Sequence, residues 1–300
     1  MRRSFLLNRL IDLVFVLFGV SVIAFLLIRL VPGDAVAVML GANTEVTPER
    51  VAELRARIGL DQPLVIQYVH WIAAVLRGDF GLSLWTRRPV ISEIEANISP
   101  TIELTVLALL VGTTLALPLG VLMAKLRGRA WEIGLRIGSV AGLTIPSFWL
   151  GIMMILVLSA AAPQLQMLGY VPLSEDPLGN LARLVLPALA LALPILANLS
   201  RLMRSAMLDV LQQDYIRAAR AKGVSERSIL YKHALRNALI PFVTSVGITT
   251  GYLLSGAIVV EQVFAIPGIG RLILGAIAER NYPLLQATIL LVTLVFVGVN

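Results

Sequence analysis

The chain has 300 residues, of which 58% are hydrophobic and 14% are charged, and its mean hydropathy is +0.86. This composition is typical of a polytopic membrane protein and excludes a soluble globular enzyme. Because the chain has no cysteines, disulfides, thiolate metal sites and cysteine nucleophiles are excluded as well. The net charge of +7 does not indicate nucleic acid as a partner, since the basic residues gather on one side of the predicted membrane spans.

Stretches without Asp, Glu, Lys or Arg predict where the chain crosses the membrane. A helix needs about 20 apolar residues to cross roughly 30 Å of hydrocarbon. The third stretch could hold two helices and a tight hairpin, but Gln164, Gln166 and nearby prolines favour one helix that ends near Ala162. We therefore predict six spans, in residues 13–28, 104–124, 137–174, 184–200, 237–260 and 281–300.

The distribution of Lys and Arg predicts a cytoplasmic N-terminus. The N-terminal arm and residues 125–136 are basic, and residues 201–236 carry eight Lys and Arg against three acids. The intervening loops at 163–183 and 261–283 carry few or balanced charges, as the positive-inside rule expects of loops outside the cell membrane. The first span is predicted to remain as an anchor and not to be a signal peptide, because no small-residue cleavage site follows Ile28.

The segment between the first two spans is too long for a connector, and we predict that it folds as a small helical element outside the membrane. Thr47 is a predicted N-cap for a helix that ends at Gly59, and a second helix is predicted from residue 64 to residue 76. His70 and Trp71 are interpreted as packing residues. A lid on the membrane domain and a contact with an external partner are both open as roles of this element.

The predicted organisation has three parts. They are residues 1–30, with the N-terminal arm and the first span, residues 31–103, with the external element, and residues 104–300, with five spans and the loop at 201–236.

No ionisable residue lies within the six predicted spans, whereas an ion-coupled carrier or an intramembrane enzyme would place such groups at that depth. The two histidines lie on opposite sides of the membrane in this topology, so they form no metal site or catalytic pair in one chain. No P-loop sequence is present for ATP. We therefore expect no catalytic residue, metal site or cofactor in this chain, and a membrane scaffold remains an alternative to a transporter.

Small polar residues cluster in the third and fifth spans. They could line a hydrophilic path or form hydrogen bonds between helices, and the sequence leaves both readings open. These candidate path residues are Ser139, Thr144, Ser147, Thr244, Ser245, Thr249 and Thr250.

The loop at 201–236 contains the capping and terminating residues of two helices. Asp214 is a predicted N-cap for a helix over residues 215–222, and Gly223 is its predicted stop. Ser225 is predicted to cap a second helix that continues into the fifth span. An eight-residue helix is not stable alone in water, so this one should dock on something, and its basic face with the small Ala218 and Ala219 favours a cytoplasmic protein.

These residues resemble a known family. The sequence RAARAKG at 217–223 is similar to the EAAxxxG core of the coupling loop in permease subunits of bacterial ABC importers, with Arg217 in place of the glutamate. DYIRAARAKG followed by LRNALIP resembles the dipeptide and oligopeptide branch, which also imports nickel chelates and glutathione. Further similar motifs are LVPGD at 30–34, GLDQPL at 59–64, GDFGLSL at 78–84, VVEQVFAIPGIGRL at 259–272 and RNYPLLQA at 280–287.

The resemblance implies the six-helix fold of type I ABC importer permeases, as a multi-pass protein of the bacterial inner membrane. Its implied partners are a second, related but different permease chain, two ATP-binding subunits that hold ATP and Mg, and an external substrate-binding protein. A dipeptide or short oligopeptide is the expected substrate, with glutathione or a nickel chelate as the alternative.

The same resemblance implies two sets of site residues. Residues expected to couple the chain to the ATP-binding subunits are Asp214, Tyr215, Arg217, Ala218, Ala219, Arg220, Lys222, Gly223, Ser225 and Glu226. Residues expected to contact the binding protein are Glu261, Arg271, Glu279 and Arg280.

Overall fold

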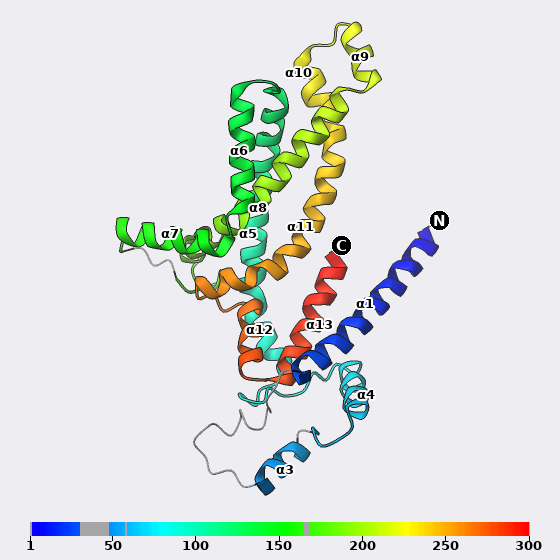
Figure 1. Ribbon diagram of the computed structural model, residues 1–300, viewed down its shortest axis with the longest axis vertical. Helices are drawn as coiled ribbons and strands as arrows, with labels where there is room; N and C mark the ends of the chain where they lie inside the picture. The colour runs from blue at the N-terminus through cyan, green and yellow to red at the C-terminus, as the bar shows by residue number, and fades with distance from the viewer. Residues whose placement is uncertain (1, 31–47, 58, 165–167, 300) are drawn as a thin grey trace. The chain divides into compact units, whose positions relative to one another are not determined.

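The computed structural model describes residues 2–30, 48–57, 59–164 and 168–299, and this part of the chain is helical (Figure 1). Among the described residues there is no β-strand, and Leu82 and Pro89 form an isolated antiparallel bridge. The all-helical prediction is thus confirmed for these residues. The helices are α1 (Arg2–Leu30), α3 (Pro48–Arg57), α4 (Leu64–Val75), α5 (Val90–Lys125), α6 (Ala130–Thr144), α7 (Ser147–Ala161), α8 (Pro177–Leu211), α9 (Asp214–Ala221), α10 (Glu226–Ser228), the π-helical turn η1 (Ile229–Ala234), α11 (Leu235–Val263), α12 (Ile269–Ala278) and α13 (Tyr282–Val299).

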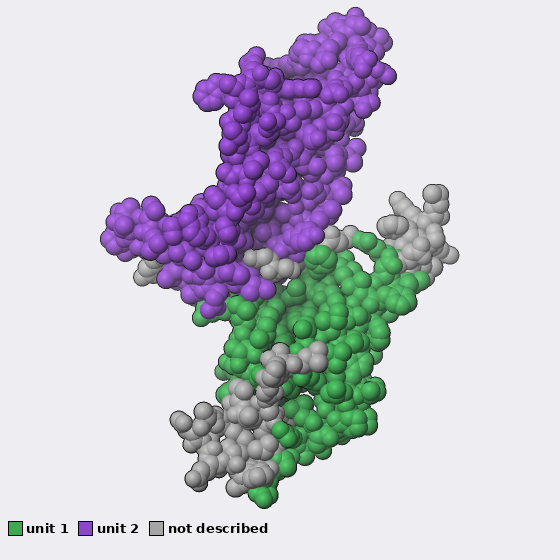
Figure 2. All heavy atoms as spheres, viewed as in Figure 1, with its two compact units in different colours: residues 1–99, 268–298 green, residues 100–267, 299–300 purple. Residues whose placement is uncertain are grey.

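The chain divides into two compact units (Figure 2). Unit 1 contains residues 1–99 and 268–298, and unit 2 contains residues 100–267 with the last two residues. In unit 2, α8 is the central helix, since it contacts α6, α7 and α11. Apolar residues recur along its buried face and form much of the core of this unit: Leu184, Leu191, Leu199, Met203 and Met207.

Unit 1 has its own apolar core. Val90 and Ile94 at the start of α5 are buried in one cluster with Ile269 of α12 and Leu285 of α13. Elsewhere in this unit α4 contacts α1, and Phe25, Tyr68 and Trp71 form a cluster with ring centroids 5.3 to 5.9 Å apart. Aromatic packing of this kind fixes α4 on the end of α1.

Two helices of the described residues, α5 and α8, are long and apolar enough to cross a membrane. The number rises to four if each of two bent helix pairs is one span: α6 with α7, and residues 226–253 with 257–263. Shorter apolar helices cover residues 11–27 and 282–298, where the first and sixth spans were predicted. The described residues therefore contain two to four candidate membrane spans.

The prediction of one continuous third span is wrong. α6 ends at Thr144, and α7 begins at Ser147 at an angle of 98° to it. The break lies at Pro146, which has no N–H to continue the helical ladder and disfavours helical geometry in the residue before it. Ile145 accordingly has an extended backbone with ψ 120°. The predicted end is correct, since Ala161 is the last residue of α7.

The two helices predicted between the first two spans follow the predicted boundaries. α3 ends at Arg57 and Gly59 has a φ of 69°, and α4 covers Leu64–Val75. Thr47, the predicted N-cap, lies outside the described residues. Trp71 packs as predicted, but the same interpretation is wrong for His70, which is exposed and makes no ring contact with the aromatic cluster.

Candidate functional site

The segment between α8 and α11 contains one short helix and a tight turn. α9 begins directly after Gln213, whose backbone is extended, and the predicted stop at Gly223 is confirmed by its φ of 80°. The predicted N-cap is wrong by one residue. Asp214 is already helical and makes no capping bond; its carboxylate pairs with Arg217 at 3.4 Å, and a negative charge in the first turn favours the helix dipole.

Three contacts hold α9 against the rest of unit 2. The Ile216 side chain is completely buried. Tyr215 Oη accepts a hydrogen bond of 2.8 Å from Asn237 Nδ2, and Arg220 Nε donates one of 2.7 Å to Glu226 Oε1. The hydrogen bond from Arg220 lowers the pKa of the Glu226 carboxyl, so this link is ionised at neutral pH.

Most of α9 is free for another molecule. Apart from Ile216 and the half-buried Ala219, each of its residues is exposed. Figure 1 shows α9 beyond the ends of α8 and α11, at one end of unit 2. The exposed cations Arg217, Lys222 and Arg227 surround it. A protruding helix with small and basic side chains, fixed by one apolar anchor, is suited to insertion into a cleft of a partner protein.

The helix after the turn begins as predicted and then departs from regular geometry. Ser225 Oγ accepts the backbone N–H of Ser228 at 3.4 Å, which confirms the predicted cap. Residues 229–234 then form the π-helical turn η1, in which the N–H of Leu235 donates to the carbonyl of Leu230. The sequence contains no signal for this turn. Such turns often lie at functional sites, and here it joins α9 to the long α11.

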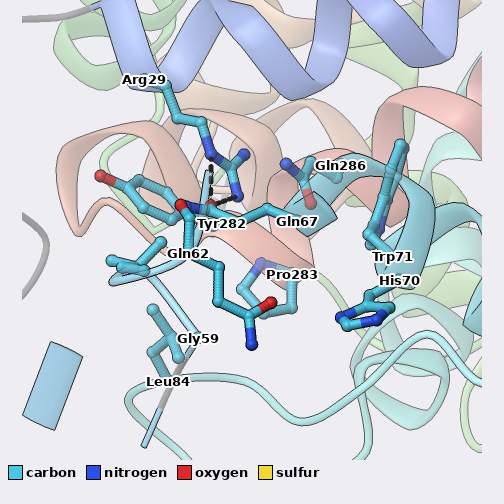
Figure 3. Close-up of a pocket in the computed structure, with 11 residues that line it drawn as sticks. Arg29, Gly59, Gln62, Gln67, His70, Trp71, Leu84, Tyr282, Pro283 and Gln286 are labelled. Carbon is cyan, nitrogen blue, oxygen red and sulfur yellow. Dashed lines mark hydrogen bonds between the residues drawn. The ribbon is translucent and has the colours of Figure 1, made fainter. Parts of the chain in front are cut away.

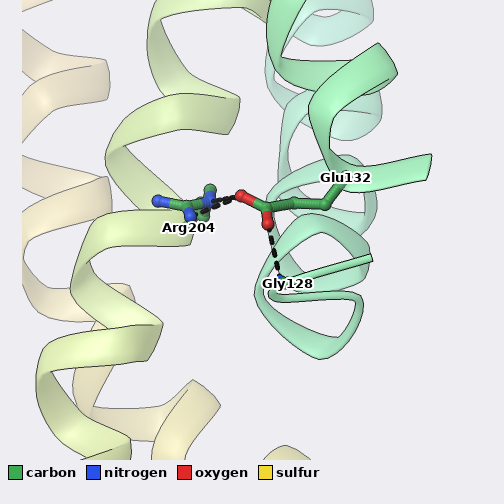
Figure 4. A network of polar contacts seen from close by, with 3 residues as sticks. All are labelled: Gly128, Glu132 and Arg204. Atoms are coloured by element: carbon green, nitrogen blue, oxygen red, sulfur yellow. Dashed lines mark hydrogen bonds and ion pairs between the residues drawn. The ribbon is translucent and has the colours of Figure 1, made fainter. Parts of the chain in front are cut away.

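An ion pair near the cytoplasmic end predicted for unit 2 was missed by sequence reasoning (Figure 4). Glu132 in the first turn of α6 is only 5% exposed. Arg204 of α8 donates to Glu132 Oε1 from Nε at 2.9 Å and from Nη2 at 2.5 Å, and the Gly128 N–H donates to Oε2 at 2.9 Å. These bonds fasten the start of α6 to α8, below the loop that carries α9.

The candidate path residues bond mainly within their own helices. Ser139 is one exception, since its Oγ also lies 3.5 Å from Ser200 Oγ of α8. Ser147 is the first residue of α7, and the carbonyl of Ser245 accepts the Thr249 hydroxyl. A translocation path along these residues stays a prediction. The hydroxyls that donate to a carbonyl one turn back are those of Ser139, Thr144, Thr244, Thr249 and Thr250.

The four residues expected to meet an external protein differ in exposure. Glu261 at the end of α11 is fully buried, and Thr101 donates a hydrogen bond of 2.5 Å to it. A partner protein therefore cannot reach this carboxylate in the conformation described. Arg271 and Glu279 are exposed, and Arg280 is half-buried with a φ of 53°.

A second missed feature, in unit 1, ties the turn before α13 to residues 83–85, which precede α5. Asn281 is buried, its Oδ1 accepts the Leu84 N–H at 3.1 Å, and its Nδ2 donates to Ser83 Oγ at 2.8 Å. Trp85 Nε1 donates to the carbonyl of Glu279 at 2.8 Å. Residues almost 200 positions apart are thereby joined, which no local pattern could predict.

Fold and site together define a helical protein with helices long and apolar enough to cross a membrane and with one short, exposed helix, α9. The family described as "Binding-protein-dependent transport system inner membrane component" matches residues 116–300, and the N-terminal part of such membrane components matches residues 1–105. The chain is 37% identical over 296 residues to a probable peptide ABC transporter permease protein of Sinorhizobium fredii, covering 99% of this chain and 94% of the relative. It is 40% identical over 300 residues to the glutathione transport system permease protein of Escherichia coli, again covering 99% and 94%.

The chain therefore belongs to the family of binding-protein-dependent transport system inner membrane components. It is a permease of the ABC importer class, as the motifs around α9 indicate.

Proposed function

We propose that this chain is the permease subunit of an ATP-driven importer of short peptides, and that α9 couples ATP hydrolysis to transport. The single observation that supports the coupling role is the way in which α9 is attached to unit 2. One buried side chain, Ile216, and two polar contacts hold it, while its remaining surface is exposed and basic. A force on this helix would be passed through η1 into α11, which contacts α8.

The proposed assembly contains four further protein chains. A second, related permease chain completes the membrane part, and two ATP-binding subunits dock below it and hold ATP and Mg. Catalysis belongs to those subunits, so this chain itself contributes binding and motion only. An external binding protein delivers the substrate, and the exposed Arg271 and Glu279 with Arg280 are its proposed contacts.

The proposed topology has six spans with a cytoplasmic N-terminus. Basic residues at 125–136 and 201–236 support this orientation by the positive-inside rule. The third span then consists of α6 alone or of α6 with the bent α7. In this arrangement residues 1–30 carry the first span, residues 31–103 the external element, and residues 104–300 the transport core.

The proposed substrate is a dipeptide or short oligopeptide. The name of the Sinorhizobium fredii relative supports a peptide. The name of the Escherichia coli relative supports glutathione, itself a tripeptide, as the second candidate. A nickel chelate stays the third, on the resemblance of the motifs.

The test is ATP hydrolysis by the reconstituted assembly in proteoliposomes. The rate is measured with the binding protein empty and then loaded in turn with dipeptides, longer peptides, glutathione and a nickel chelate. We expect stimulation by a loaded form that carries a peptide. Stimulation by the nickel chelate alone would contradict the proposed peptide substrate. A hydrolysis rate that no ligand changes would contradict the proposal that the chain is part of an importer.

A further inference from the structure

Unit 1 contains a cationic cavity that the proposed transport function does not use (Figure 3). Its volume is about 270 Å³, close to the lower end of the roughly 300 to 1,000 Å³ of small-molecule sites. It lies where the end of α1, the helix α4 and the start of α13 meet, and none of its eleven lining residues is acidic. Arg29, Trp71 and Gln286 bring hydrogen-bond donors to it from these three helices.

Arg29 supplies a positive charge that is balanced by no carboxylate of the described residues. Its Nε and Nη2 donate to Gln67 Oε1 at 3.2 and 3.0 Å, and its Nη1 donates to the carbonyl of Phe25 at 2.9 Å. The guanidinium also lies 3.6 Å from the centroid of the Phe25 ring. All these partners are neutral, so the described lining of the cavity carries a net positive charge that favours an anion.

Two further donors in the cavity have no partner in the structure. Gln286 is 2% exposed, and its Nε2 is buried without a hydrogen bond. Trp71 Nε1 is likewise buried and without a partner. Buried donors are costly unless they are satisfied, and both side chains line the cavity beside Arg29 (Figure 3). A ligand rich in acceptor oxygens would satisfy them.

An apolar cavity of about 420 Å³ lies on the same three helices. On α13, Gln286 lines the polar cavity, and Leu290 and Leu294, four and eight residues later, line the apolar one. On α1, Arg29 lines the polar cavity, and Ser21 and Leu17, eight and twelve residues earlier, line the apolar one. Residues four apart lie on one face of a helix. The polar cavity and the apolar cavity therefore succeed one another along the same faces of α1 and α13.

We propose that unit 1 binds an anionic phospholipid. Arg29, Trp71 and Gln286 hold its phosphate oxygens, and one acyl chain occupies the apolar cavity. Because no lining residue is acidic, the site has no partner for the ammonium of a zwitterionic headgroup, and phosphatidylglycerol should bind better than phosphatidylethanolamine. The lipid would fasten α4 and α13 to α1, independently of which substrate is transported.

The test is lipid binding to the purified transporter, delipidated in detergent and followed by native mass spectrometry and by the thermal midpoint. We expect phosphatidylglycerol to bind the wild type and to raise its midpoint. Arg29→Gln, Trp71→Phe and Gln286→Leu each remove a donor, and each should weaken binding about tenfold. Arg77→Gln is the matched control, since Arg77 is exposed and donates to its own helix at Ala73.

Three further measurements distinguish the contribution of the lipid headgroup from that of the acyl chain. Glycerol 3-phosphate and diacylglycerol should each fail to reproduce the effect of the intact lipid. Leu294→Trp, which fills the apolar cavity, should weaken binding, whereas Ile23→Trp on the exposed face of α1 should not. Equal binding of phosphatidylglycerol to the wild type and all variants would mean unspecific lipid and overturn the proposal. Full stabilisation by glycerol 3-phosphate would also overturn it, in favour of a small phosphate ester.

Discussion

Gly223 is the residue on which the turn after α9 depends. Its φ of 80° is disfavoured for any side chain and most for a β-branched one, at a cost of about 1–3 kcal/mol. We predict that Gly223→Val lowers the number of substrate molecules imported per ATP hydrolysed, because the helix loses its orientation. The measurement is uptake and hydrolysis in the same proteoliposomes.

Gly78 provides the control for this strain. It has a φ of 84° and, like Gly223, open space where a side chain would go, but it belongs to unit 1. Gly78→Val should leave the transport ratio near that of the wild type. A normal ratio in Gly223→Val would refute the role assigned to the turn.

The buried Glu132 and the half-buried Arg204 form an ion pair in unit 2. Removing one partner leaves the other without its bond, and we predict that Glu132→Leu and Arg204→Met each lower the stability by about 1–3 kcal/mol. The double variant should lose less than the sum of the two, as measured by unfolding in detergent. Strictly additive losses would show that the two side chains do not depend on each other.

At this scale the sequence predicts what local chemistry dictates. Gly223 and Ser225 lie where glycine conformations and capping require them. The partners of Glu132 and Asn281 could not be predicted, because each bond joins residues far apart in the chain. Ile216 was not singled out either, although it is the one fully buried side chain of α9.

The short helix α9 is held on unit 2 by one apolar anchor and two polar contacts. Ile216→Ala removes its apolar anchor, and truncation of a buried isoleucine costs about 2–5 kcal/mol, which is more than an eight-residue helix can lose and stay docked. We predict that the variant folds in the membrane but retains less of the ATP-hydrolysing subunit during purification. Ile240→Ala, at a side chain 68% exposed on α11, is the matched control. Equal retention in both variants would contradict the anchoring role.

The close approach of α5 to α8 depends on glycine. A Cβ at Gly120 would lie 2.5 Å from the Met203 Cβ and 2.7 Å from the Ser200 carbonyl oxygen. Gly120→Ala should therefore lower stability by about 1–3 kcal/mol through overpacking. At Gly134 nothing lies within 4 Å, so Gly134→Ala should be neutral or slightly stabilising. The measurement is thermal unfolding of the two variants, and equal midpoints would contradict the tight packing of Gly120 against α8.

The boundaries of elements were predictable where the chain carries caps and glycines, and less so inside apolar runs. Pro146 lies inside the predicted third span, yet the chain breaks there after α6 and turns by 98°. Hydropathy cannot show such a turn, because both helices beside it are apolar. Glycine spacing is a weak guide to packing: of Gly134, Gly138 and Gly142, which recur every four residues, only Gly142 meets side chains of α8, whereas Gly112 and Gly120 of α5 also face α8.

For the whole molecule, composition and charge predict a helical membrane protein, and the described residues and the family agree with that class. Motifs around α9 predict the kind of transporter. Substrate and partners could not be derived from this chain's own physics, because a permease whose substrate is delivered by a separate binding protein need not recognise that substrate strongly itself.

The central claim is that α9 docks on the ATP-hydrolysing subunit, and the absence of cysteines allows a direct test. Ala218→Cys places a single thiol on the exposed face of α9, and Leu76→Cys places one at a side chain 81% exposed in unit 1. Each is labelled with a photoreactive maleimide and irradiated within the assembled transporter. We predict that the label at position 218 cross-links to the ATP-hydrolysing subunit and that the label at position 76 does not. Absence of that cross-link at position 218, in an assembly that still imports its substrate, would contradict the account.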